Sequence, residues 1–188
     1  MDFLELVTGA RTCRRFREAE GMPAGMLDWL IECARVTPCG GNAQALRFAG
    51  AESPEASAVF PALKWAGMLT DWDGPEAGER PSGYVAILGE AGTRAKLNAI
   101  DAGIAAQTIQ LAAYTRDLGC CIFLSFDPRK IREVLGIPEN LEPLLVLALG
   151  FQKEVRRVET VGADGSVHHG EDRNQARPEP GKVCYEEK

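Results

Sequence analysis

Residues 10–18, ARTCRRFRE, gather four arginines and a threonine hydroxyl in nine positions near the start of the chain. Guanidinium groups bind phosphate and carboxylate groups through charge-assisted, fork-shaped hydrogen bonds. The chain as a whole is acidic, with a net charge of -6, whereas nucleic-acid and anionic-membrane binders usually carry a broad basic surface. The cluster is therefore local and suits one small anion. From this stretch alone, a solvated basic turn paired with Glu18 and Glu20 is the alternative.

A second polar group follows in residues 37–51, TPCGGNAQALRFAGA. Asn42 and Gln44 carry amides that both donate and accept hydrogen bonds, which suits a ligand with alternating carbonyl and N–H groups. Gly40 and Gly41 would let the backbone approach such a ligand closely. The alternative is a turn with capping amides.

The cysteines do not form a metal-binding or disulfide pattern. There is no CxxC pair, and the adjacent positions of Cys120 and Cys121 would strain a disulfide between them. The two histidines, His168 and His169, are neighbours near the C-terminus, whereas a zinc site needs spaced ligands. We therefore predict free thiols that pack in the core, and no metal site.

Helices and strands alternate along the first 151 residues without the regular unit of a parallel, doubly wound sheet. There is no GxGxxG after a first strand and no GxxxxGK[ST]. The pattern predicts a single mixed α and β domain with a buried central helix. Helices are predicted at 2–8, 23–35, 55–69, 97–119 and 127–138, and strands from about 46 and at 84–90, 120–126 and 142–151.

The predicted helix at 97–119 is apolar on nearly all sides. Such a helix needs cover all round, and in a chain of 188 residues a second subunit is a plausible cover. Residues 1–160 form the predicted domain, and residues 161–188 form a polar C-terminal arm that could pack on the partner subunit. Neither a signal peptide nor a membrane span is evident, so the expected location is cytoplasmic.

Five stretches, in order and spacing, resemble the nitroreductase family of flavin mononucleotide (FMN) enzymes. ARTCRRF resembles its RRSxRxF signature, and TPCGGNAQALRF resembles its P-S-x-x-N-x-Q-P-W-x-F loop. The other three are a loop and strand, a central helix with its following strand, and an L-G-I-P segment before a buried strand. They are DWDGPEAGERPSGYVAIL, DAGIAAQTIQLAAYTRDLGCCIF and IREVLGIPENLEPLLVLALGF, and with the first two they cover roughly residues 1–155.

The resemblance implies an α+β fold, a three-layer α/β/α arrangement with a mostly antiparallel central sheet. It implies a homodimer with FMN sites at the subunit interface. Its activity would be a ping-pong transfer of hydride from NADH or NADPH to a small-molecule acceptor of the nitroaromatic or quinone type. The cofactor carries that chemistry, so no catalytic side chain is predicted. Asp101 and Glu79, the acids weighed as proton sources, are interpreted as structural.

The resemblance also implies the cofactor-binding residues. Arg11, Thr12 and Arg14 match the part of the signature that holds the phosphate, while the first signature arginine falls on Ala10. Arg15 and Arg17 are interpreted as surface residues. Near the flavin ring the matching residues are Asn42, Gln44, Gly119, Cys120 and Cys121.

The C-terminal arm departs from the family pattern, in which a basic pair helps to hold the phosphate. No Lys-Arg pair follows the VHH at 167–169, and Arg173 or Arg177 would have to replace it. Two alternatives therefore stay open beside a reductase: a flavin-binding or flavin-storing protein without turnover, and an interaction module that kept only the scaffold. Flavin-fragmenting, dehalogenating and peptide-modifying activities are minor alternatives.

Overall fold

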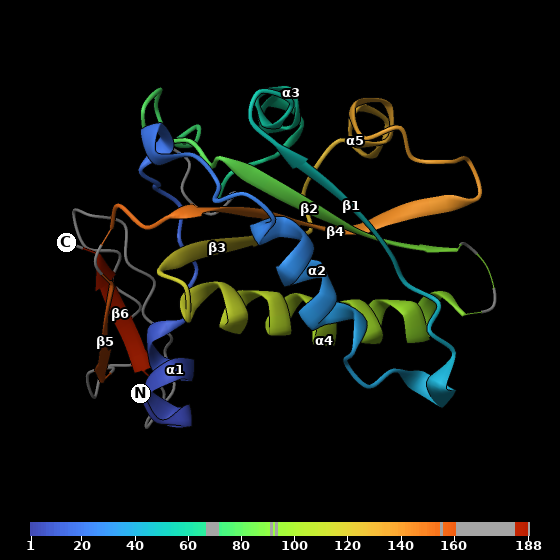
Figure 1. Cartoon of the computed structure of the whole chain (residues 1–188), viewed down its shortest axis with the longest axis horizontal. Coiled ribbons are helices and arrows are strands. Elements are labelled where there is room, and N and C mark those ends of the chain that lie inside the picture. The colour runs from blue at the N-terminus through green and yellow to red at the C-terminus, as the bar shows by residue number, and fades with distance from the viewer. Residues whose placement is uncertain (67–71, 91, 93, 155, 161–182, 188) are drawn as a thin grey trace.

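The computed structural model describes residues 1–66, 72–90, 92, 94–154, 156–160 and 183–187. Its centre is a four-stranded sheet in the order β1-β2-β4-β3, with every neighbouring pair antiparallel. A separate antiparallel pair, β5 and β6, lies beside α1 (Figure 1). The strands are β1 (Arg47–Glu52), β2 (Gly83–Glu90), β3 (Leu118–Phe123), β4 (Leu141–Phe151), β5 (Arg156–Thr160) and β6 (Val183–Glu187).

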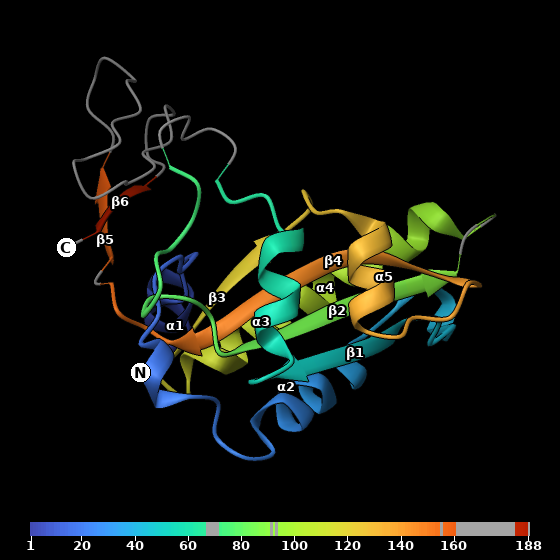
Figure 2. The same ribbon diagram turned by 90° about the horizontal axis from the view of Figure 1, so that it is seen from above.

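Helices cover both faces of the four-stranded sheet. Helices α3 and α5 lie on one face, and α2 and the long α4 lie on the other (Figures 1 and 2). The predicted α+β fold with three layers and an antiparallel sheet is therefore confirmed. The helices are α1 (Phe3–Gly9), α2 (Met26–Arg35), α3 (Ala56–Val59), α4 (Ala95–Tyr114) and α5 (Pro128–Val134), with short 3-10 turns η1 (Glu18–Glu20), η2 (Gly40–Asn42) and η3 (Phe60–Ala62).

The two-residue period of the strands divides the core between these layers. On β2, Tyr84 and Ala86 pack into the cluster under α3 and α5, while Val85 and Ile87 pack into the cluster under α2 and α4. Successive side chains of a strand point to opposite faces, so a strand covered on both faces must be apolar at every position. That is why the run YVAIL reads as continuously hydrophobic.

Helix α4 packs only one of its apolar stripes on the sheet. Ala102, Ala105 and Ile109 on this stripe are buried. A second stripe, Leu97, Ile100 and Ile104, is 40–52% exposed in the single chain. The sequence predicted that this helix needs cover on all sides, and in the single chain this second stripe is the side that lacks it. The neighbouring helix α1 adds Phe3 and Leu4, which are 70% and 74% exposed.

Two predicted helices are wrong at their C-terminal ends. The helix predicted at 97–119 ends at Tyr114, because a turn through Asp117, with φ of +60°, reverses the chain before β3 begins at Leu118. The helix predicted at 55–69 gives way at Phe60 to a 3-10 turn that ends at Ala62. Pro61 lies in that turn, and proline supplies no N–H to continue an α-helix. Residues 67–69 lie outside the described residues.

Other predicted boundaries agree within a few residues. The predicted cap at Asp127 is confirmed, because its carboxylate accepts hydrogen bonds from the backbone N–H groups of Arg129 and Lys130. Of the C-terminal arm, residues 161–182 and 188 lie outside the described residues, and its strand β6 pairs with β5. None of the described helices is long and apolar enough to span a lipid bilayer.

We predict that Ile109→Ala lowers the free energy of unfolding by about 2–5 kcal/mol, because it leaves a cavity between α4 and the sheet. Ile109 has no exposed surface. Leu124→Ala is the control, since Leu124 is 81% exposed and its loss should cost less than about 0.5 kcal/mol. Urea denaturation of both variants tests this, and equal losses would contradict the assigned packing.

Candidate functional site

The stretch 10–17, called here the arginine loop, runs along the outer edge of strand β3. The backbone N–H of Cys13 donates to the carbonyl of Cys120 at 2.9 Å, and Thr12 forms a parallel bridge with Cys120. The two segments approach so closely that a Cβ at Gly119 would lie 2.4 Å from Sγ of Cys13. The structure therefore brings the predicted residues of the arginine loop and of β3 together.

Three further hydrogen bonds hold the backbone of the arginine loop. Nε2 of Gln110, on α4, donates to the carbonyl of Ala10 at 2.9 Å. Nη1 of Arg156 donates to the carbonyl of Arg11. The backbone N–H of Arg14 donates to Oε1 of Glu154 at 2.6 Å. The loop is thus fixed by groups from α4 and from the segment after β4.

Side chains of the arginine loop help to form a small cavity with a positive lining. Thr12 and Arg14 line it together with Lys64. The cavity measures about 180 Å³, below the roughly 300–1,000 Å³ of a complete small-ligand pocket. We call it the cationic cavity. Its remaining lining residues are Ala66, Cys121, Ile122, Phe123, Leu124 and Ser125.

Two cysteines beside this cavity, Cys13 and Cys120, are buried thiols with raised pKa values. Burial raises the pKa of Cys13 and of Cys120 well above the usual value of a thiol. Since the thiolate is the nucleophilic form, both remain protonated at neutral pH. Cys13 and Cys121 pack in the core cluster under α3 and α5, and Cys120 packs in the cluster under α2 and α4. No disulfide joins the described cysteine side chains, which are at positions 13, 33, 39, 120 and 121.

The two predicted amides lie in residues 39–44, called here the amide loop. Nε2 of Gln44 donates to Oδ1 of Asn42 at 3.3 Å, and both residues have a φ of +50°. Non-glycine residues rarely adopt this left-handed region. The loop is anchored by the buried Asp101, whose Oδ1 accepts the backbone N–H of Gly40 at 2.9 Å. This contact agrees with the interpretation of Asp101 as structural.

The arginine loop and the amide loop lie at opposite ends of α4 in the single chain. Asp101 contacts the amide loop and Gln110 contacts the arginine loop. These two residues are nine positions apart, which at 1.5 Å per residue is about 13 Å along the helix. Figure 1 shows the cyan η2 turn near the N-terminal end of α4 and α1 at its other end. Asn42 and Gln44 therefore do not join Thr12 and Arg14 within one subunit.

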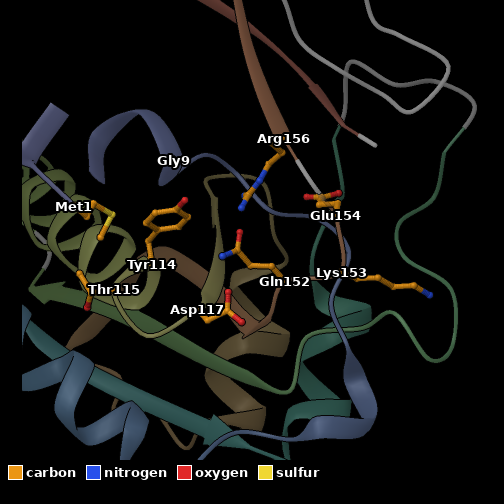
Figure 3. A pocket seen from close by; sticks show the side chains of 9 residues that line it. All are labelled: Met1, Gly9, Tyr114, Thr115, Asp117, Gln152, Lys153, Glu154 and Arg156. Atoms are coloured by element: carbon orange, nitrogen blue, oxygen red, sulfur yellow. The ribbon is translucent and has the colours of Figure 1, made fainter. Parts of the chain in front are cut away.

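A second pocket, of about 550 Å³, lies at the C-terminal end of α4. In Figure 3 the side chains of Tyr114, Gln152 and Arg156 point toward one another, with Glu154 beside Arg156. Both Glu154 and Arg156 bond to the backbone of the arginine loop. Both pockets therefore border the arginine loop, this one beside Gly9 and the cationic cavity beside Thr12 and Arg14.

Glu79, the other acid weighed in the sequence, forms ion pairs beside the arginine loop. Its carboxylate lies 2.8 Å from Nζ of Lys153 and 3.6 Å from Nε of Arg15. Its backbone carbonyl also accepts the N–H of Phe16 at 2.9 Å. These contacts agree with a structural role for Glu79.

Three residues at this site were not predicted from the sequence: Lys64, Glu154 and Arg156. Arg156 and Arg157 form an arginine pair after the last strand of the sheet, a signal that could have been used. The basic residues expected to hold the phosphate were instead Arg173 or Arg177, which lie outside the described residues. Lys64 and Glu154 carry no pattern in the sequence, because only the fold brings them to the loop.

Comparisons with known proteins point to one family. Residues 81–151, which include β2, α4, β3 and β4, match the model of the nitroreductase family. No curated protein sequence is similar enough to count as a match. The match confirms the resemblance expected from the sequence for this part of the chain.

Solved structures share the fold over most of the chain. A nitroreductase family protein from Clostridium difficile 630 is 24% identical, with a TM-score of 0.66 over 82% of this chain and 87% of that one. One from Clostridium novyi NT is 23% identical, with a TM-score of 0.67 over 81% and 86%. An FMN-dependent nitroreductase from Clostridium difficile R20291 is 18% identical, with a TM-score of 0.63 over 80% and 88%. At these identities the likeness shows the fold.

We predict that Gly119→Ala displaces the arginine loop from β3 and lowers stability by about 1–3 kcal/mol, because the added methyl would overlap the Cys13 side chain. Gly50→Ala on β1 is the control, since its Cβ would meet side chains at an ordinary 3.5 Å. Thermal unfolding and amide hydrogen exchange of residues 10–17 would report the change. Unchanged exchange in Gly119→Ala would contradict the close contact.

Proposed function

We propose that this chain is an FMN-dependent oxidoreductase of the nitroreductase family. The observation that carries the proposal is the cationic cavity at the junction of the arginine loop and the outer edge of β3. Thr12, Arg14 and Lys64 there combine a hydroxyl group with two cations. Beside them, Cys121, Ile122 and Leu124 form an apolar wall. A phosphate-bearing, flat aromatic cofactor needs this combination.

The donors suit the charge of FMN. Its phosphate carries about two negative charges near neutral pH, by analogy with phosphorylated side chains. Thr12 and Arg14 supply a hydroxyl and a guanidinium. Arg156 lines the second pocket rather than the cationic cavity, and it brings a further positive charge to the backbone of Arg11. We propose that Arg156 compensates for the arginine missing at position 10. Ala10 is buried and its side chain carries no charge, so position 10 contributes none to the site.

We also propose that a second copy of the chain completes the site. The exposed stripe of Leu97, Ile100 and Ile104 on α4 gives two copies an apolar surface to bury. Pairing two α4 helices antiparallel across a two-fold axis would place each arginine loop near an amide loop. The cationic cavity would then be extended by Asn42 and Gln44 of the partner subunit. Its small volume in a single chain supports this arrangement.

When bound, FMN would accept hydride from NADH or NADPH and pass it to a small oxidised acceptor such as a quinone or nitroaromatic. The chain's own contribution is binding and electrostatics. Arg14 and Lys64 would place positive charge at the phosphate, whose negative charge is permanent, and would hold the cofactor in position through charge-assisted contacts. The buried, protonated thiols of Cys13 and Cys120 are kept out of covalent chemistry.

We predict that Arg14→Ala weakens FMN binding at least tenfold, because it removes a charge-assisted contact worth about 1.5–3 kcal/mol. Arg17→Ala is the matched control from the same loop. Arg17 is exposed and pairs with Glu20 and Asp117, and its loss should change the affinity less than twofold. Flavin fluorescence quenching with both variants and the wild type measures this.

Wild-type protein that neither contains nor binds FMN would contradict the proposed function and favour an interaction module. Steady-state oxidation of NADH and NADPH with menadione as acceptor then separates a reductase from a storage protein. Stoichiometric FMN without turnover would favour storage.

We predict that two variants with impaired FMN binding restore binding when they are co-expressed. Arg14→Ala breaks the arginine-loop half of each site, and the double variant Asn42→Ala, Gln44→Ala breaks the amide-loop half. If each site is built from two subunits, a mixed dimer has one intact site and one site broken in both halves. Random pairing makes half of the dimers mixed, so about a quarter of the FMN sites should recover. Recovery below the noise, with dimers verified by sedimentation, would show that each site lies within one subunit.

A further inference from the structure

Glu154 is a buried carboxylate at the back of the arginine loop. Its side chain is 7% exposed, and Oε1 accepts the backbone N–H of Arg14 at 2.6 Å. Among the described residues no N–H or O–H group donates to the buried Oε2, and the thiol of Cys13 is a weak donor to this carboxylate. A buried carboxylate with so few donors is costly, so packing alone gives no reason to keep an acid at this position.

The surroundings of Glu154 place its charge close to the proposed phosphate site. Burial is the main cause of the raised pKa of Cys13, the negative charge of Glu154 raises that pKa further, and Arg156 opposes it. The carboxylate and the guanidinium therefore both act on the middle of the arginine loop. Figure 3 shows Glu154 and Arg156 side by side, and Arg156 in turn bonds to the carbonyl of Arg11.

The bond to the Arg14 N–H gives Glu154 two opposite effects on an anion in the cationic cavity. As an acceptor, it holds the loop in the conformation that directs Thr12 and Arg14 toward the cavity. As a negative charge, it repels a phosphate bound beside the same loop. Charges several ångströms apart in a partly buried site still interact strongly, because the effective dielectric constant is far below that of water.

We propose that Glu154 is a built-in counter-anion that sets how strongly the site prefers FMN over riboflavin. The inference rests on the proposed function, since it concerns the same site. The hydrogen bond that Glu154 accepts from the Arg14 N–H should affect the binding of both flavins equally, because both need an ordered arginine loop. The charge acts only on the flavin that carries a phosphate. Glu154 is thus a specificity-determining residue that acts through the arginine loop.

The test measures the dissociation constants of FMN and of riboflavin for the wild type and for Glu154→Gln. Glutamine keeps an acceptor for the Arg14 N–H and removes the charge. We expect FMN to bind roughly tenfold more tightly to this variant and riboflavin to change less than twofold. The gain for FMN should shrink in 1 M salt, where charges are screened over about 3 Å.

Two further variants serve as controls, one that keeps the charge at position 154 and one that removes a different charge beside the same loop. Glu154→Asp keeps the charge and should keep the preference between the flavins at the wild-type ratio. Glu79→Gln removes another carboxylate beside the same loop, one that is already paired with Lys153 and Arg15. The ratio of its dissociation constants for riboflavin and FMN should stay within twofold of the wild-type ratio. Equal melting temperatures establish that each variant is folded.

The outcomes separate this inference from the proposed function. If wild-type protein binds FMN but Glu154→Gln shows the wild-type ratio, the inference is wrong and the proposed function stands. A similar loss of affinity for both flavins would also overturn it, because Glu154 would then act only as a loop anchor. If the wild type binds neither flavin, the proposed function fails and the inference falls with it.

Discussion

The contact between the arginine loop and the outer edge of β3 is the constraint on which the rest of the site depends. It exists because residue 119 has no side chain, so Cys13 can pack directly against the strand. The carbonyl of Cys120, Nε2 of Gln110 and the carboxylate of Glu154 then fix the loop from three segments that are far apart in the sequence. Each of these bonds satisfies a backbone group that would otherwise be costly to bury.

Helix α4 determines how far apart the two halves of the proposed site lie. Near one end Asp101 accepts the N–H of Gly40, and near the other end Gln110 binds the carbonyl of Ala10. The distance between the two loops is therefore set by the length of a rigid helix, which packs on the sheet through the buried Ala105 and Ile109. A composite site across a dimer follows from this separation as a proposal, since a helix cannot shorten to bring its own ends together.

Buried carboxylates recur as loop anchors in the described part of the chain. Asp101 holds the amide loop and Glu154 holds the arginine loop, each through one oxygen, while no N–H or O–H group of the described residues donates to the second oxygen. Removing the charge of a buried acid near a ligand site changes electrostatics as well as packing. The residues that order the two loops thus also bring negative charge close to them.

The sequence by itself determined the alternation of helices and strands, the antiparallel α+β class through its resemblance, and the local chemistry of the arginine loop. Periodicity and caps are local, so Asp127 and the run YVAIL could be assigned without a fold. It did not determine where α4 ends, because the turn at Asp117 depends on a left-handed backbone conformation that no strong signal announced. Only the tertiary structure decided that Lys64, Glu154 and Arg156 meet the arginine loop, and that Asn42 and Gln44 lie away from it. Contacts between distant segments arise from packing across the sheet, and no spacing in the sequence encodes them.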